Sequence, residues 1–379
     1  MEICKREECC GCGVCVEVCP QKCITMKLDE EGFYYPSVAT EKCIHCKLCQ
    51  TVCPGNSEMK TTDNTEAYAI LNVSKGIREN SSSGGAFYSL ASKVLEAEGI
   101  VFGVAFTEGC EEVKHICIEN IDELEKIMGS KYVQTTPIDN LYQSIRKALR
   151  NDKIVLFSGT PCQVGACKRF LENEKTTKLI TVDLICHGVP APGVWKKYLK
   201  ETASNIKNVF FRDKTEGWRT FSLKIDTNDR TILQRESQNA YMKGFLNDLY
   251  SRICCYNCKF KGLNRESDIT LGDFWKVGNM LPRLDDDMGT SIVFTHSEKG
   301  DALLQSVIED PDIKFCKVEA SAVVDGNPMI FESIKLSKKR NKFFTNWKEL
   351  SIENNVMLCL RKNIYEKIVG KIKWGILRK

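Results

Sequence analysis

Short apolar runs alternate with amphipathic stretches from Ala67 onward, and this pattern predicts alternating strands and helices. Ten runs rich in β-branched and aromatic residues are expected to be strands: 67–73, 100–106, 113–118, 154–157, 179–185, 209–211, 222–226, 268–271, 291–295 and 313–318. Helices are expected at 85–97, 121–128, 137–149, 165–172, 194–201, 238–251 and 300–308. This alternation favours an α/β body with a largely parallel or mixed sheet covered by helices. The 209–234 stretch is typical of a hairpin and predicts an antiparallel excursion.

The first 58 residues follow a different pattern. Eleven cysteines lie within the first 53 residues, and two short apolar runs at 24–28 and 32–36 predict a hairpin. Residues 55–66 have almost no large apolar side chain and are expected to be a linker. We therefore expect a small domain at 1–58, an α/β body at 67–335 with parts 67–150 and 151–335, and a basic helical tail at 336–379.

Two copies of the pattern C-x2-C-x2-C-x3-C-P stand 34 residues apart. The first copy is Cys9, Cys12, Cys15 and Cys19; the second is Cys43, Cys46, Cys49 and Cys53. With this spacing, three close cysteines bind one [4Fe–4S] cluster and the fourth binds the other. The sequence therefore predicts an α+β ferredoxin-like domain with one cluster on Cys9, Cys12, Cys15 and Cys53 and another on Cys43, Cys46, Cys49 and Cys19. Zinc or disulfides are the alternatives, but zinc sites do not need eight cysteines in a crossed arrangement.

Composition and charge narrow the class of protein. The chain has 379 residues, 21 cysteines and a net charge of +4, with 42% hydrophobic and 27% charged residues. These values are typical of a globular protein of two or three domains, and the charge is too small to indicate a nucleic-acid partner. The N-terminus has no secretory pattern and no run of eighteen apolar residues occurs, so we expect a cytoplasmic protein with reduced thiols.

Four further cysteines follow or lie near predicted strands. Cys162 follows the strand at 154–157, Cys186 follows the strand at 179–185, and Cys255 and Cys258 form another C-x2-C. Ligands in an open α/β sheet collect beyond the carboxyl ends of the strands, so these thiols are candidates for a third [4Fe–4S] cluster. A zinc site on the same four cysteines and a reactive Cys162 with His187 as its base are the alternatives.

The remaining cysteines have no ligand spacing. Cys10 and Cys23 are expected to be packing residues, no role is assigned to Cys4, and Cys254 is set aside in favour of Cys255. Cys110, Cys117, Cys167, Cys316 and Cys359 are expected in the core.

Two polar glycine turns are candidates for binding an anion. Residues 79–87 (ENSSSGGAF) precede a predicted helix, whose first N–H groups could approach a phosphate. Residues 129–132 (GSKY) form a second turn, in which Lys131 could face the same anion. A serine-rich helix start is more often only a cap, so this pattern is weak by itself.

Seven motifs occur in an order that resembles the family of coenzyme F420 hydrogenase/dehydrogenase beta subunits, in its form with an N-terminal two-cluster ferredoxin domain. They are 81–85 (SSSGG), 129–134 (GSKYVQ), 157–163 (FSGTPCQ), 183–190 (DLICHGVP), 211–218 (FRDKTEGW), 255–260 (CYNCKF) and 268–275 (DITLGDFW). The resemblance covers roughly residues 1–300. Such proteins are iron–sulfur flavoproteins that bind FAD and pass electrons between clusters and a hydride acceptor.

The resemblance implies roles for individual residues. The turns with Ser82, Ser83, Gly84 and Gly85 and with Ser130, Lys131 and Tyr132 would hold FAD, and Cys162, Cys186, Cys255 and Cys258 would hold a cluster beside it. Arg212, Lys214, Asp273 and Phe274 would lie near the flavin or the substrate. No proton donor is identified; His187, Tyr132 and Asp273 are the catalytic candidates by location.

The expected function is an oxidoreductase that takes electrons from ferredoxin or another redox protein. Its hydride acceptor would be an F420-type deazaflavin or an unidentified substrate in surface-polysaccharide synthesis. An electron-transfer beta subunit of a hydrogenase or formate dehydrogenase complex, with no substrate of its own, is the alternative, and a redox sensor without flavin is a third. The C-terminal residues place Ile364, Ile368, Ile372 and Ile376 among basic residues, which is typical of a helix that packs on its own domain or lies on an anionic membrane surface.

Overall fold

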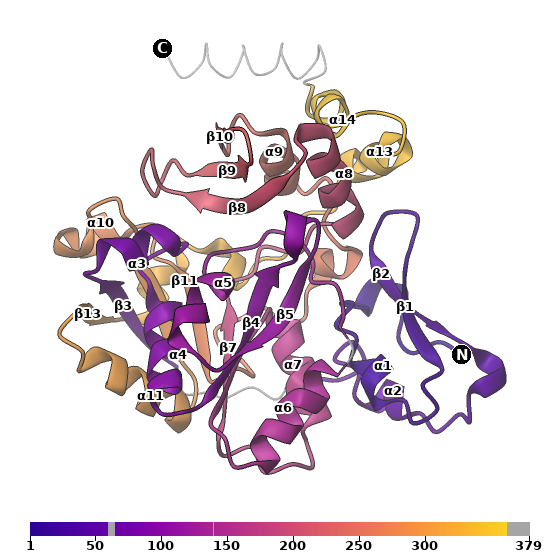
Figure 1. The fold of residues 1–379 in the computed structure, drawn as a ribbon, viewed down its shortest axis with the longest axis horizontal. Helices are drawn as coiled ribbons and strands as arrows, with labels where there is room; N and C mark the ends of the chain where they lie inside the picture. Colours follow the sequence, from indigo (N-terminus) through magenta and orange to yellow (C-terminus); the bar gives the residue numbers. More distant parts are fainter. Residues whose placement is uncertain (60–64, 139, 362–379) are drawn as a thin grey trace.

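A computed structural model describes residues 1–59, 65–138 and 140–361. The N-terminal cluster domain lies at one side of a larger body (Figure 1). It contains the short helices α1 (Val14–Val18) and α2 (Leu48–Thr51) and the antiparallel hairpin of β1 (Ile24–Leu28) and β2 (Tyr34–Val38). The predicted hairpin is therefore confirmed. The predicted basic helix at 364–376 lies outside the described residues and stays a prediction.

The body is built on a mixed eight-stranded sheet of order β13-β3-β12-β11-β7-β6-β4-β5. Its strands are β3 (Glu66–Asn72), β4 (Ile100–Phe106), β5 (Val113–Ile118), β6 (Val155–Ser158), β7 (Leu179–Leu184), β11 (Ile269–Asp273), β12 (Ser291–Thr295) and β13 (Ile313–Val318). The four central strands, β11, β7, β6 and β4, are parallel, and the outer pairs are antiparallel. The mixed sheet predicted from the sequence is confirmed.

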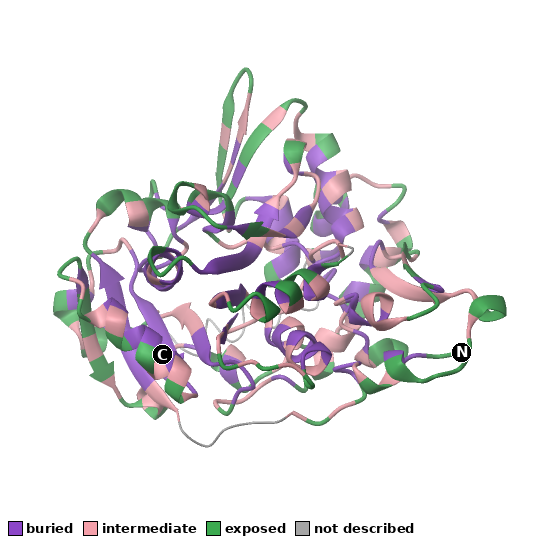
Figure 2. Cartoon of the chain, turned by 60° about the horizontal axis from the view of Figure 1, so that its bottom comes forward, coloured by how far each residue is buried: buried purple, intermediate pink, exposed green. Residues whose placement is uncertain are grey.

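Helices cover both faces of this sheet. On one face, α4 (Ala86–Glu96), α5 (Leu124–Ile127) and α11 (Glu298–Ile308) pack against alternate strand residues such as Ile70 and Leu156. On the other face, α6 (Leu141–Arg150) and α7 (Pro161–Phe170) cover β4, β6 and β7. Strands in the middle of the sheet, such as β6 and β12, are accordingly mostly buried, whereas the edge strand β13 is largely exposed (Figure 2).

A three-stranded antiparallel sheet forms a second layer (Figure 1). It consists of β8 (Ile206–Asp213), β9 (Ser222–Thr227) and β10 (Thr231–Arg235), which confirms the predicted antiparallel excursion. An aromatic cluster joins it to α8 (Pro192–Thr202), α9 (Ala240–Leu246), α13 (Lys338–Asn346) and α14 (Ile352–Leu360). The last two helices lie in the expected helical tail, although their bounds were not predicted, and the described part of this tail packs against the body through Phe343 and Val356.

Several helix boundaries differ from the predicted ones for local reasons. Helix α7 begins four residues early because Thr160 and Gln163 form a capping box and Pro161 starts the first turn. Helix α6 begins late, after a left-handed Asn140, and α9 ends early, before a left-handed Asp248. The short helices α3 (Lys75–Asn80), α10 (Val277–Met280) and α12 (Ala320–Val324) were missed because they are too short to show a helical period.

Candidate iron–sulfur and flavin sites

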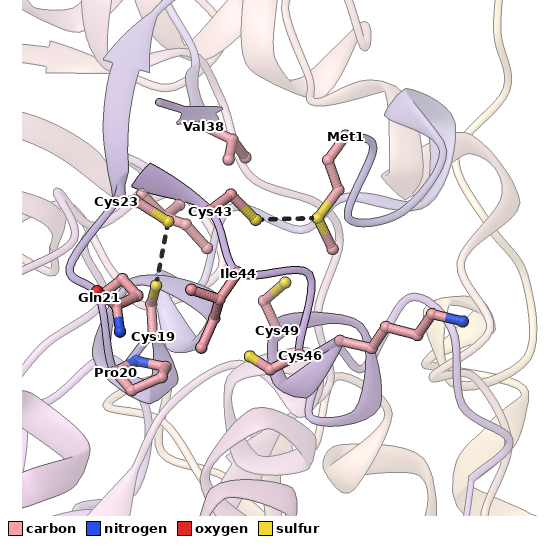
Figure 3. Close-up of a pocket in the computed structure, with 12 residues that line it drawn as sticks. Met1, Cys19, Pro20, Gln21, Cys23, Val38, Cys43, Ile44, Cys46 and Cys49 are labelled. Atoms are coloured by element: carbon pink, nitrogen blue, oxygen red, sulfur yellow. Dashed lines mark hydrogen bonds between the residues drawn. The ribbon is translucent and has the colours of Figure 1, made fainter. Parts of the chain in front are cut away.

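The cluster domain brings its motif cysteines together in two groups. We call Cys9, Cys12, Cys15 and Cys53 site I, and Cys19, Cys43, Cys46 and Cys49 site II. In site I, burial raises the pKa of Cys15, and the charges of Cys9 and Cys53 raise it further. In site II, the four thiols line one pocket together with Cys23 (Figure 3). The two groups are those that crossed ligation of two cubanes requires.

Left-handed residues shape the cluster-binding loops in both copies of the repeat. Gly11 and Gly13 have φ of 71° and 78°, and the equivalent His45 and Lys47 have φ of 54° and 64°. Only the first copy faces the body, where a Cβ at Gly11 would lie 2.2 Å from Gln134 Nε2. Glycine is therefore needed in the first copy, whereas larger residues fit the exposed second copy.

Four cysteines of the body converge at a third place, which we call site III: Cys162, Cys186, Cys255 and Cys258. Strands β6 and β7 are parallel neighbours, so Cys162 and Cys186 emerge at the same edge of the sheet, as predicted. Burial raises the pKa of Cys186, followed by the charges of Cys255, Cys162 and Cys258. The 3₁₀ turn at Ile253–Asn257 carries Cys255, and the backbone N–H of Cys258 donates to Ser333 Oγ at 3.0 Å.

In the described part of the chain, no group of three or more His, Cys, Asp or Glu side chains is gathered around one point as a single metal ion requires. A cubane gives each thiolate its own iron, so its ligands need not converge on one centre.

Four cysteines outside the predicted ligand sets contact these sites. Cys23 Sγ lies 3.4 Å from Cys19 Sγ of site II. Cys4 hydrogen-bonds with Cys53 and Cys9, and Cys10 with Cys12 and Cys162. Cys254 hydrogen-bonds with Cys255. Cys10 thus stands between sites I and III, where only a packing role was expected. A reactive Cys162 is disfavoured, because the hydrogen bond with Cys10 and burial raise the pKa of its thiol.

The two polar glycine turns meet in the structure. Ser82 Oγ lies 2.7 Å from Ser130 Oγ and accepts from the Ser130 backbone N–H at 2.6 Å. Gly84 donates to Ser291 Oγ at 2.9 Å, and Gly85, with φ of 89°, precedes α4. The turns from two distant motifs therefore form one continuous wall.

Positive side chains lie behind this wall. Burial lowers the pKa of Lys131 to about 7, and its ammonium donates to the Met128 carbonyl at 2.6 Å. Burial likewise lowers the pKa of Lys214 to about 7; its ammonium donates to the carbonyls of Arg78, Ser83 and Met288. Lys214 therefore positions the turn through its backbone instead of offering a free ammonium.

The three catalytic candidates are joined in one chain of contacts. The His187 and Tyr132 rings lie 5.0 and 5.1 Å from the Phe245 ring. Arg212 donates to the Tyr132 hydroxyl at 3.3 Å and to Asp273 Oδ2 at 3.0 Å. Residues from four separate sequence motifs thus line one region next to Cys186 of site III.

The structure adds two facts about this region. Asp248 Oδ1 lies 2.8 Å from His187 Nε2, on a residue 61 positions away. Phe274, which was expected at the flavin or the substrate, is 1% exposed and packs in the core with Trp218 and Val277, so its place at a ligand stays a prediction.

Comparison with known families accounts for this arrangement. Residues 152–321 match the family described as coenzyme F420 hydrogenase/dehydrogenase, C terminus of the beta subunit, and residues 8–57 match the 4Fe-4S dicluster domain. Residues 152–321 thus form the C-terminal region of the coenzyme F420 hydrogenase/dehydrogenase beta subunits, joined here to a 4Fe-4S dicluster domain. The resemblance seen in the sequence motifs is therefore confirmed, and so is the dicluster domain.

Individual relatives of this family are distant. The F subunit of the F(420)H(2) dehydrogenase of Methanosarcina mazei is 24% identical over 236 residues, which are 57% of this chain and 64% of that protein. The match thus spans less than two thirds of this relative's length. A chain in the F420-reducing [NiFe] hydrogenase complex from Methanosarcina barkeri has a TM-score of 0.48 and 16% identity, over 72% of this chain and 90% of that chain.

Other features of this family member were not visible in its sequence. Cys117 is exposed, although a core position was expected, because it lies on the outward face of the edge strand β5. Cys316 is half-buried, while Cys110, Cys167 and Cys359 are buried as expected. Arg252 contacts Cys9 of site I but lies in none of the sequence motifs, so only the tertiary structure reveals it. Among the described helices, none is long and apolar enough to cross a bilayer.

Proposed function

We propose that this protein is an iron–sulfur flavoprotein oxidoreductase that takes electrons from ferredoxin or a similar redox protein and delivers a hydride to a small-molecule acceptor. Sites I, II and III would each hold a [4Fe–4S] cluster, and the wall formed by residues 82–85 and 130–132 would hold FAD. FAD, when bound, converts the single electrons that clusters carry into a two-electron hydride transfer. The observation that carries this proposal is the convergence of His187, Tyr132, Arg212 and Asp273 beside site III.

The residues present suit these groups chemically. Each site offers four cysteine thiols, the donor set of a cubane. Behind the two turns, the Nε atoms of Arg78 and Arg212 are buried without a hydrogen-bond partner in the described structure. The other guanidinium nitrogens already pair with carboxylates, Arg78 with Asp286 and Arg212 with Asp273. The two Nε donors remain for a bound anion, and the pyrophosphate of FAD would be one.

The side chains next to the wall have distinct roles on this proposal. Asp248 holds His187 by its Nε2, which leaves Nδ1 to hold or release a proton at the substrate. Arg212 fixes the Tyr132 hydroxyl and is itself held by Asp273. Lys214 keeps the Ser83 carbonyl in place. The acceptor would be an F420-type deazaflavin or another hydride acceptor.

Exposure indicates where electrons enter. Cys46 of site II is exposed, whereas Cys9, Cys15 and Cys53 of site I are buried. Site II would therefore face the redox partner, and site I would lie between it and site III.

The composition of the anaerobically purified protein tests the cofactors. We expect about twelve iron atoms and one FAD per chain. About eight iron atoms together with zinc would remove the cluster from site III, and no flavin would end the flavoprotein proposal.

The alternative function is a beta subunit that transfers electrons without a substrate of its own. The name of the Methanosarcina mazei relative, which is one subunit of a dehydrogenase, favours it. Turnover of the single purified chain with reduced ferredoxin and an acceptor would support the enzyme, and turnover that requires an added partner protein would support the alternative.

A further inference from the structure

Arg252 is a wholly buried cation at the junction of the cluster domain and the body. Its side chain is 0% exposed, and it immediately precedes the turn that carries Cys255. Across the described chain, no carboxylate forms an ion pair with it, unlike the buried Arg340, which pairs with Glu31. A buried charge is costly unless an opposite charge compensates it, so Arg252 requires another anion.

The contacts of Arg252 identify that anion. Its Nε donates to the Cys9 carbonyl at 2.6 Å and one terminal nitrogen lies 3.4 Å from Cys9 Sγ. The other terminal nitrogen donates to Gln134 Oε1 at 3.1 Å, and the guanidinium lies 4.0 Å from the centre of the Tyr35 ring. Every polar contact is therefore neutral except the one with the sulfur of a proposed cluster ligand.

We propose that Arg252 raises the reduction potential of the cluster at site I through its uncompensated charge and its contact with Cys9 Sγ. This inference rests on the cluster assignment of the proposed function. On reduction, the cluster with its four thiolates gains one electron from the donor, and its net charge changes from about −2 to −3. A fixed buried cation stabilises the more negative state, as hydrogen bonds to cluster sulfurs do.

Because site I lies between sites II and III, a raised reduction potential there would direct electron flow. Site II is the exposed end of the chain of clusters, and Cys10 links site I to Cys162 of site III. A raised potential at site I draws the electron inward from site II and holds it at the junction until the second electron arrives. Arg252 is thus a positioning residue for electron flow and does not touch the substrate.

Gln134→Glu is the sharpest test, because it places a carboxylate against Arg252 with almost no change in volume. We expect the midpoint potential of one N-terminal cluster to fall, with at least a tenfold change in its reduction equilibrium, which is about 59 mV for one electron. Arg252→Met should lower the same potential further, and Arg252→Lys, which keeps the charge, should lower it less. The readout is a dithionite titration followed by electron paramagnetic resonance, on protein with verified iron content.

Gln134→Met is the matched control, since it has a similar volume and removes the hydrogen bond to Arg252 without placing a charge there. It should leave the potential of the cluster at site I nearly unchanged, because the charge of Arg252 stays uncompensated. Unchanged potentials in both Gln134→Glu and Arg252→Met, at full iron content, would overturn the inference. The proposed function would survive that result, since flavin content and turnover with reduced ferredoxin test it separately.

Discussion

Two cysteines that are neighbours in the chain, Cys254 and Cys255, have different proposed roles, since only Cys255 is a proposed ligand of site III. Cys254 and Cys255 are adjacent, but the 3₁₀ turn directs Cys255 toward Cys162 and Cys186, while Cys254 hydrogen-bonds with Cys255 and lies near Cys10 and Arg252. Spacing alone favours Cys255, since only this register forms C-x2-C with Cys258. The structure adds a physical reason for choosing Cys255: the side chains of two consecutive residues point in different directions, so only one of them can point into site III.

This pair offers a direct test of the ligands of site III. Cys255→Ser should lower the iron content by about four atoms per chain, because the cluster loses one of its four thiolates. Cys254→Ser, at the adjacent position, should leave the iron content unchanged. Equal iron content in the two variants would contradict the assignment of Cys255.

At the scale of elements, the serine–glycine turn before α4 is shaped by its close packing on the strands β3 and β12. A Cβ at Gly84 would lie 2.4 Å from the Ile70 carbonyl oxygen and 2.6 Å from the Ser291 N–H. Both neighbours are backbone atoms of the main sheet, which cannot move aside without disturbing its ladder. The glycine is therefore required by the packing of the turn on the end of the sheet, whether or not a flavin is bound.

Gly84→Ala should destabilise the protein by about 1–3 kcal/mol, as overpacking against backbone does, and should lower the flavin content. Gly76→Ala is the matched control, because Gly76 lies in α3 with no heavy atom within 4 Å of an added Cβ. Alanine there should be neutral or stabilise by about 0.5–1 kcal/mol. Chemical denaturation and flavin absorbance measure both effects, and equal losses in the two variants would contradict this view of the turn.

At the scale of the whole molecule, the β1–β2 loop anchors the cluster domain on the body. Gly193 donates to the Gly32 carbonyl at 3.0 Å, and a Cβ at Gly193 would lie 2.8 Å from the Gly32 Cα. The Trp347 indole donates to the Glu30 carbonyl at 3.2 Å, and Arg340 pairs with Glu31. These contacts hold site I against Arg252 from the side opposite the junction with α7.

Gly193→Ala should therefore loosen the docking of the loop without removing any cluster ligand. We expect faster proteolysis within residues 29–33 and slower electron transfer from the N-terminal clusters to the flavin, at unchanged iron content. Limited proteolysis and stopped-flow reduction by dithionite measure these effects. Unchanged rates of both proteolysis and flavin reduction would contradict the anchoring role.

The stability of the whole molecule should also depend on pH through two buried histidines. His115 and His296 are 4% and 2% exposed, and burial lowers the pKa of each from 6.5, to about 4 and about 3. The unfolded chain therefore binds more protons than the folded chain below pH 6.5, so stability is full above this pH and falls as the pH decreases. Between pH 7 and 5.5, each histidine should cost about 1 kcal/mol.

His115→Gln should flatten the fall of the unfolding temperature between pH 7 and 5.5, because it removes one of the two groups. The exposed His45→Asn is the control and should leave the slope as it is, since asparagine also accepts the left-handed backbone at this position. A slope that His115→Gln leaves unchanged would contradict the assignment to His115.

Much of the architecture could be predicted because it depends on local patterns. Buried strands such as β6 and β7 are continuous apolar runs, and the cysteine spacing in the two cluster motifs is enough to predict their ligands. The short helices were missed, and the bounds of α13 and α14 within the expected helical tail were not predicted, because packing partners and not periodicity stabilise these helices. The same reason explains Asp248 and Arg252, whose roles depend on residues 61 and 243 positions away.

The sequence by itself determined the cluster-binding repeat, the succession of strands along the chain and the family, since each of these is a pattern of neighbouring residues. Only the tertiary structure decided which cysteine stands between two sites, which aspartate holds His187, and which arginine meets the Cys9 sulfur. Burial, and the charge that it leaves uncompensated, is a property of the packed chain, because it depends on contacts between segments far apart in sequence.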